Sequence, residues 1–113
     1  MGYNKDTNMY EGYIYKITNI KNQKAYIGQT ITSVEHRIGQ HFSNNKNKSC
    51  RILKNALEKY GKESFKYETL ISISNKTKKQ LCIELNELEI QFIYEYNTIS
   101  PNGYNISKGG YNH

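Results

Sequence analysis

The feature that most restricts the fold of this chain is the segment 77–96, whose apolar residues recur with helical spacing. Thr77 followed by Gln80 is the pattern of a capping box, which predicts that a helix begins here and runs to about Tyr96. At roughly 100° per residue, one arc of this helix collects the large apolar side chains: Leu81, Cys82, Leu85, Leu88, Phe92, Ile93 and Tyr96. Glu89 falls inside the same arc. A carboxylate among core-facing side chains is costly unless it is paired or binds a metal, so its presence there needs a reason.

A β-hairpin is predicted nearer the N-terminus. Residues 13–18 are rich in aromatic and β-branched types, residues 19–24 are polar, and residues 25–28 resume the strand pattern. Side chains alternate between the faces of a strand, so a loop with an even number of residues would place Tyr15 and Tyr26 on the same side of the sheet. Two phenol groups would then point in the same direction.

Two shorter helices and a third strand are predicted between these regions. Ser33 is a suitable N-cap, and Arg37 and His41 lie in one row of the helix that follows it. The apolar residues at helical spacing are Val34, Ile38 and Phe42 in this helix, and Leu53, Ala56, Leu57 and Tyr60 in the next, which Gly61 would end. Alternation over residues 65–73 predicts the strand.

The length of 113 residues suits one compact domain, so residues 1–113 are predicted to form a single unit, with 1–11 as a flexible N-terminal segment. The sequence has no apolar run of the length that a membrane span needs, and residues 1–10 are polar. The two cysteines, Cys50 and Cys82, lack zinc-ligand spacing and suit a reducing compartment. We therefore expect an intracellular, cytoplasmic protein.

The charge balance favours a polyanionic partner. Sixteen Lys and Arg residues against ten Asp and Glu residues give a formal net charge of +6. Cationic side chains release the counterions condensed on nucleic acid, so nucleic acid is the leading partner class. The stretch 43–49 is dominated by Asn and Lys and predicts an exposed basic loop.

The hairpin and helices would supply two phenols, a guanidinium, an imidazole and a carboxylate, a set that suits phosphodiester hydrolysis. Glu89 is the candidate Mg²⁺ ligand, because this cation takes oxygen ligands and often keeps several waters. The donor fork of Arg37 matches phosphate geometry and would stabilise charge in the transition state. Tyr15, Tyr26 or His41 would orient or deprotonate the attacking water.

Each of these residues also has a structural interpretation. A tyrosine on a small sheet is usually a core or surface aromatic, and Arg37 with Glu89 would serve as a structural ion pair. His41 would be a helix-surface histidine, and Lys46 and Lys48 would belong to a solvated loop. The residues alone support a basic α/β domain with a polar cluster and leave hydrolysis open.

The same residues resemble the motifs of the GIY-YIG nuclease family, over nearly the whole chain from Gly12 to Gly110. The matching segments, in the family's order, are Gly12-Tyr13-Ile14-Tyr15 with one extra residue after the glycine, Tyr26-Ile27-Gly28, His36-Arg37 with His41-Phe42, Glu89-Ile90-Gln91-Phe92-Ile93, and Asn102-Gly103-Tyr104-Asn105. Their shared order and spacing make coincidence improbable.

The resemblance implies an α/β (α+β) fold with a small three-stranded antiparallel sheet flanked by helices. It also implies one divalent metal on Glu89, Tyr15 or Tyr26 beside the attacking water, and a supporting role for Asn105. The chain departs from some homing-type members at His36, where they carry lysine, and by lacking their second histidine in the following loop. A role for that second histidine cannot be carried over, which makes His41 more important to test.

We therefore expect a Mg²⁺-dependent DNA endonuclease in which Mn²⁺ can replace Mg²⁺. The expected DNA contacts are His36, Lys46, Lys48 and Lys108. The alternatives are an inactive basic DNA-binding module of the same fold and a basic RNA-associated structural protein. No membrane partner is expected, and the chain is expected to be a monomer or a weak dimer. Resemblance to homing-type members points to a phage- or virus-encoded protein that acts in the host cell.

Overall fold

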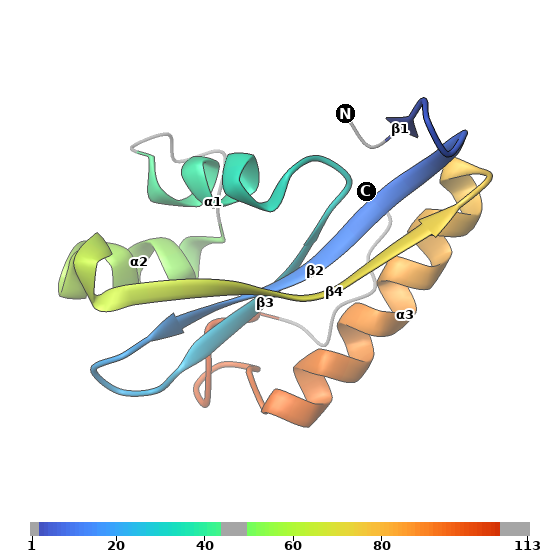
Figure 1. Ribbon diagram of the computed structural model, residues 1–113. Coiled ribbons are helices and arrows are strands. Elements are labelled where there is room, and N and C mark those ends of the chain that lie inside the picture. Colours follow the sequence, from blue (N-terminus) through green and yellow to red (C-terminus); the bar gives the residue numbers. More distant parts are fainter. Residues whose placement is uncertain (1–2, 44–49, 107–113) are drawn as a thin grey trace.

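The structure, a computed structural model, describes residues 3–43 and 50–106, which form an antiparallel sheet with helices on both faces (Figure 1). Helices α1 and α2 lie on one side of the sheet and α3 on the other (Figure 1). The elements in chain order are β1 (Tyr3–Asn4), β2 (Met9–Asn19), β3 (Ala25–Thr30), α1 (Val34–Phe42), α2 (Arg51–Tyr60), the 3₁₀ helix η2 (Lys62–Ser64), β4 (Phe65–Asn75) and α3 (Lys78–Tyr96). The expected architecture of an antiparallel sheet flanked by helices is confirmed.

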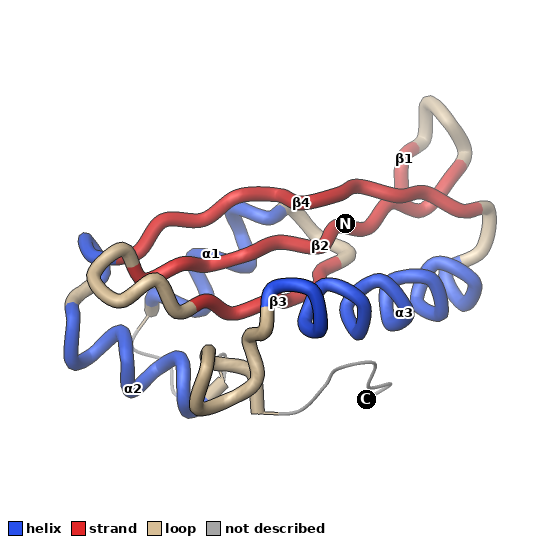
Figure 2. The backbone as a smooth tube through the Cα atoms, turned by 90° about the horizontal axis from the view of Figure 1, so that it is seen from below, coloured by secondary structure: helices blue, strands red, loops and turns tan. Residues whose placement is uncertain are grey.

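The central strand of the sheet is β2, which pairs antiparallel with β3 on one side and with β4 on the other (Figure 2). The two-residue strand β1 pairs with the start of β2, so the sheet formed by residues 3–43 and 50–106 has four strands and not the expected three. Within the described residues, β3 pairs along its length only with β2. The outer edge of β3 is therefore open to side chains from other elements.

The extra strand arises because residues 3–11, expected to belong to a flexible segment, form a β-hairpin. Asn8 has a φ of 63°, a left-handed conformation that asparagine tolerates better than most residues. Its N–H donates to the Asn4 carbonyl oxygen at 2.8 Å. The rings of Tyr3 and Tyr10 pack edge to face with centroids 4.8 Å apart. A strand of two residues is too short to show alternation in the sequence.

Two apolar clusters, one on each face of the sheet, hold the helices in place. As strand alternation requires, Tyr15 and Ile17 point to one face while Ile14 points to the other. Each fully buried aliphatic side chain contributes about 1.5–3 kcal/mol. The cluster under α1 and α2 contains Tyr15, Ile17, Val34, Ile38, Leu53, Ala56, Leu57, Phe65 and Tyr104, and the cluster under α3 contains Ile14, Ile27, Leu81, Leu85 and Ile93.

Helices α1 and α3 begin at the residues that the sequence predicted. The Ser33 hydroxyl accepts from the His36 N–H at 3.1 Å, and the Thr77 hydroxyl accepts from the Gln80 N–H at 3.1 Å. Helix α3 ends at Tyr96 and is capped by Asn97, which has a φ of 55°. Over the two described ranges, no helix combines the length and the apolar character needed to cross a membrane.

Candidate active site

The register of the β2–β3 hairpin brings two tyrosines together on the α1 side of the sheet. Tyr15 lies opposite Gly28, and Ile17 lies opposite Tyr26. Because Tyr15 and Ile17 are two residues apart on one strand, Tyr15 and Tyr26 share a face. Their ring centroids are 6.5 Å apart. The predicted common orientation of these phenols is confirmed.

Gly28 makes room for the Tyr15 ring. A Cβ atom placed on Gly28 would overlap the Cζ and Oη atoms of Tyr15. The ring therefore lies across β3, with its hydroxyl above that strand and not above its own. Any larger residue at position 28 would have to displace the phenol.

His41 holds the hydroxyl of Tyr15 from the opposing helix α1. The distance from Tyr15 Oη to His41 Nε2 is 2.7 Å, and the His41 ring meets the Tyr26 ring edge to face with centroids 5.3 Å apart. His41 is fully buried, so the interpretation as a helix-surface histidine is wrong. Burial, followed by the nearby Arg37 guanidinium, lowers the pKa of His41 to about 3. The imidazole is therefore neutral at ordinary pH.

Charges of opposite sign act on the same two phenols. Burial raises the pKa of Tyr15 well above its usual range; Tyr26 and Glu89 also raise it, while Arg37 lowers it through its charge and a hydrogen bond. For Tyr26, burial again raises the pKa most, Cys50 and Glu89 add to this rise, and Arg37 opposes it. Both phenols are therefore protonated at neutral pH, and both feel the charges of a guanidinium from α1 and a carboxylate from α3.

Glu89 reaches this site from the helix on the other face of the sheet. It is half-buried, in contrast to the fully buried Leu85 one turn earlier in the same helix. Its Oε1 accepts from the Gln29 Nε2 at 3.3 Å, and the same nitrogen donates to Asn86 Oδ1 at 2.8 Å. Gln29 lies on β3, so the carboxylate is tied to the open edge of the sheet. This placement explains how an acid on the α3 side acts on phenols on the α1 side.

Asn105 supports the site by bonding to the backbone of β3. Its Oδ1 accepts from the Ile27 N–H at 2.8 Å and from the Thr98 hydroxyl at 2.8 Å, and its Nδ2 donates to the Ile27 carbonyl at 2.9 Å. The amide thus acts as a neighbouring strand would. Its contacts are with the strand that carries Tyr26 and Gly28, so its geometry is that of a positioning residue.

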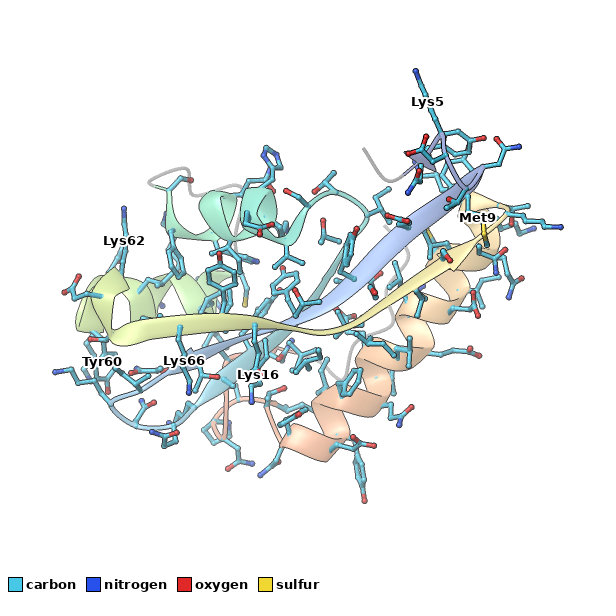
Figure 3. The ribbon with its side chains drawn as sticks, in the orientation of Figure 1. Lys5, Met9, Lys16, Tyr60, Lys62 and Lys66 are labelled. Atoms are coloured by element: carbon cyan, nitrogen blue, oxygen red, sulfur yellow. The ribbon has the colours of Figure 1, made fainter. Side chains whose placement is uncertain are left out.

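The expected DNA-contacting residues are only partly described. His36 is exposed on α1, where its Nε2 lies 3.4 Å from the Gln40 Nε2. Lys46, Lys48 and Lys108 lie outside the described residues. Other lysines lie at the two ends of the molecule: Lys5 at one end and Lys62 at the other (Figure 3).

The donor set around Glu89 fits a cation that brings most of its own ligands. In residues 3–43 and 50–106, no three His, Cys, Asp or Glu side chains come together in a way that could hold a metal ion. Mg²⁺ is usually bound through one or two carboxylates together with waters and substrate phosphate oxygens, whereas a structural Zn²⁺ needs four protein ligands. A half-buried carboxylate at a strand edge suits the first of these and not the second.

Two residues of the site, Gln29 and Asn86, were not identified from the sequence. Asn86 had a usable signal, because it falls in one helical row with Cys82, Glu89 and Ile93 and is therefore a second polar residue on the core-facing side of α3. Gln29 had none, since a glutamine that follows a strand motif has no preferred role.

Comparison with known proteins agrees with this geometry. The family model described as the GIY-YIG catalytic domain matches residues 11–105. Among solved structures, a glutamate-to-alanine mutant of the catalytic domain of intron endonuclease I-TevI is similar, with a TM-score of 0.68 and 30% identity, covering 90% of this chain and 99% of that one. The catalytic domain of homing endonuclease I-TevI gives a TM-score of 0.64 and 31% identity, covering 85% and 98%.

Two curated proteins of Invertebrate iridescent virus 6 are also similar in sequence. Putative MSV199 domain-containing protein 146R is 28% identical over 92 residues, which are 81% of this chain and 36% of that protein. Uncharacterized protein 019R is 30% identical over 95 residues, which are 83% of this chain and 33% of that protein. The chain thus spans about a third of the length of the curated relatives it matches.

Proposed function

Because this chain belongs to the GIY-YIG family, we propose that it is a Mg²⁺-dependent endonuclease that hydrolyses phosphodiester bonds of DNA. One observation carries the proposal: Arg37 and Glu89, from helices on opposite faces of the sheet, act with opposite sign on the pKa of the same two phenols. A phosphodiester needs positive charge at its non-bridging oxygens and an anchored cation beside the attacking water. These residues offer both within one site.

DNA is the proposed substrate for two reasons. The similar solved structures bear the names of an intron endonuclease and a homing endonuclease, and the formal net charge of +6 favours a polyanion. Exposed His36, together with Lys46, Lys48 and Lys108, would contact the phosphate backbone. Such contacts position the DNA without reading its sequence, so selectivity is expected to be weak.

Arg37 would bind the scissile phosphate, since its planar fork of donors can bond two phosphate oxygens at once. Glu89 would hold the cation, with Mn²⁺ able to replace Mg²⁺. When bound there, the cation supplies a lowered pKa for a coordinated water and positive charge at the phosphate. Asn105 would keep β3 in place beneath both groups.

The protonated phenols would orient the attacking water and would not act as preformed phenolates, because burial raises the pKa of both Tyr15 and Tyr26. With His41 in the tautomer whose Nε2 carries no proton, the Tyr15 hydroxyl donates a hydrogen bond to Nε2. The Tyr15 oxygen can then accept a proton from the water while its own proton passes to His41. The phosphate charge would offset Arg37 and so favour protonation of His41 at that moment.

Nicking of supercoiled plasmid in the presence of Mg²⁺ tests the proposal. The expected result is that the wild-type protein nicks the plasmid, whereas Glu89→Gln and Arg37→Ala each lose at least about 100-fold in rate, as removal of one charge-stabilising group typically does. Glu87→Gln is the matched control, since Glu87 is exposed on the same helix. It is expected to behave as wild type.

Two results would contradict the proposal. Equal nicking by wild type, Glu89→Gln and Arg37→Ala would mean that the activity comes from a contaminant. Salt-sensitive DNA binding with no cleavage under Mg²⁺ or Mn²⁺, unchanged by Glu89→Gln, would identify the inactive binding module instead.

A further inference from the structure

Asn86 occupies a position on α3 where an amide is costly unless it is hydrogen-bonded. Its side chain is only 8% exposed, and it precedes Glu89 by three residues, so the two side chains lie on the same face of the helix. The Oδ1 atom of Asn86 accepts from the Gln29 Nε2 at 2.8 Å. The amide is therefore directed at the side chain that also contacts Glu89.

Gln29 uses a single nitrogen for both of its bonds to α3. Nε2 donates to Asn86 Oδ1 and, at 3.3 Å, to Glu89 Oε1. An amide nitrogen carries two hydrogens, so the two acceptors together account for both. The flipped amide would place its carbonyl oxygen against a carbonyl and a carboxylate oxygen, which repel it. The two acceptors thus fix the orientation of the Gln29 amide, and the bond to Asn86 is the shorter of the two.

From this arrangement we propose that Gln29 and Asn86 are positioning residues for the metal-binding carboxylate of Glu89; the inference rests on the proposed function. Asn86 holds the Gln29 amide, and Gln29 holds Oε1 of Glu89. A glutamate side chain has several rotatable bonds whose freedom is lost when it binds a cation. A carboxylate that is already held in one orientation loses less conformational entropy when it binds. Gln29 and Asn86 therefore strengthen cation binding without touching the cation.

A purely structural role for the pair would have a different signature. Gln29 lies on β3 and Asn86 on α3, so their bond also links the sheet to the helix. Loss of that link alone would lower the free energy of unfolding and leave the affinity of the folded protein for a cation unchanged. Cation affinity of the folded chain therefore separates the two roles.

The test is a Mn²⁺ titration of the full chain. Binding is measured by the paramagnetic broadening of backbone amide resonances near residue 89 in ¹H–¹⁵N spectra. Gln29→Met keeps the length of the side chain and removes the donor, and is expected to weaken Mn²⁺ binding by about 10-fold or more, as loss of a partner that orients a metal ligand typically does. The same spectra report whether each variant is folded. Gln29 is half-buried, so this variant is expected to fold.

Gln91→Met is the matched control. It removes a bond of the same type, from Gln91 Nε2 to Glu95 Oε1 at 3.0 Å, at an exposed place on the helix that carries Glu89. Its Mn²⁺ affinity is expected to equal that of wild type. An equal loss in Gln91→Met and Gln29→Met would overturn the inference.

Asn86 variants test whether Asn86 acts on Glu89 through Gln29. Asn86→Leu is expected to weaken Mn²⁺ binding, and combining it with Gln29→Met is expected to add little, because both changes break one coupled unit. Asn86→Asp keeps an oxygen acceptor for Gln29 and is expected to bind Mn²⁺ at least as tightly as wild type. Fully additive losses, or a loss in Asn86→Asp equal to that in Asn86→Leu, would overturn the inference.

Glu89→Gln separates failure of this inference from failure of the proposed function. If Glu89→Gln abolishes the broadening but Gln29→Met binds Mn²⁺ as wild type does, the positioning role is wrong and the metal ligand stands. If Glu89→Gln binds Mn²⁺ as tightly as wild type, or wild type binds none, the proposed metal ligand itself is wrong, and the positioning role falls with it.

Discussion

Replacing Asn105 by alanine should destabilise the whole domain, although this residue lies in the C-terminal segment and contributes no apolar surface. The side chain is only 7% exposed and makes three hydrogen bonds, with the N–H and the carbonyl of Ile27 and with the Thr98 hydroxyl. The two bonds to Ile27 join residues 78 positions apart in the sequence. In Asn105→Ala, all three of these groups would lose their hydrogen bond to the Asn105 side chain.

The magnitude follows from those contacts. A buried hydrogen bond contributes about 1 kcal/mol net, so three bonds give about 3 kcal/mol, and more if the Ile27 groups stay without water. For a domain of this size, such a loss corresponds to a fall in Tm of about 10 °C. Urea unfolding followed by circular dichroism measures the free energy of unfolding directly.

The control for this change is Asn102→Ala in the same segment. Asn102 is exposed, and its Nδ2 is 3.4 Å from the Asn97 Oδ1, so its loss should cost less than about 0.5 kcal/mol. A cost below about 1 kcal/mol for Asn105→Ala, or equal costs for the two variants, would refute the view that Asn105 acts as a substitute strand for β3.

Three further predictions concern the site and its surroundings. Gly28→Ala would push the Tyr15 ring away from His41 and should slow plasmid nicking by about 100-fold. Gly39 is exposed on α1, and a Cβ atom added there would have no neighbour within 4 Å. Gly39→Ala should therefore raise the free energy of unfolding, measured in urea, by about 0.5–1 kcal/mol. Since the pKa of His41 is about 3 when folded against 6.5 when unfolded, the unfolded chain binds a proton first as the pH falls. The free energy of unfolding should therefore drop by about 2 kcal/mol between about pH 8 and about pH 5. Urea unfolding at the two pH values should show that this drop is missing in His41→Gln and is retained in His36→Gln, the control at an exposed site.

Local sequence patterns predicted most of the elements because their causes are local. Alternation gave the β2–β3 hairpin and the shared face of Tyr15 and Tyr26, and capping residues gave the starts of α1 and α3. The inward turn of Glu89 followed from helical spacing, although the side chain is half-buried and not fully buried. Each of these features depends on residues within a few positions of one another.

The features that could not be predicted depend on contacts between distant segments. The bonds from Asn105 to Ile27 and from Gln29 to α3 have no trace in spacing or composition, because a polar side chain in a strand or turn is compatible with many partners. The burial of His41 is of the same kind. Its row on α1 was predictable, but its enclosure depends on where the hairpin places Tyr15 and Tyr26.

The position of β3 at the edge of the sheet explains how these distant segments form one site. Layers that pack on a sheet lie about 10 Å from it, so groups from helices on opposite faces cannot meet through a central strand. At the edge they can, and the outward backbone groups there need partners to avoid pairing with another chain. The C-terminal segment supplies such partners for the backbone groups of Ala25 and Ile27. Two residues further along β3, the side chain of Gln29 bonds to α3. The contacts that protect the edge strand therefore hold the same strand that carries Tyr26, Gly28 and Gln29, which is why Asn105→Ala is expected to affect both the edge and the site.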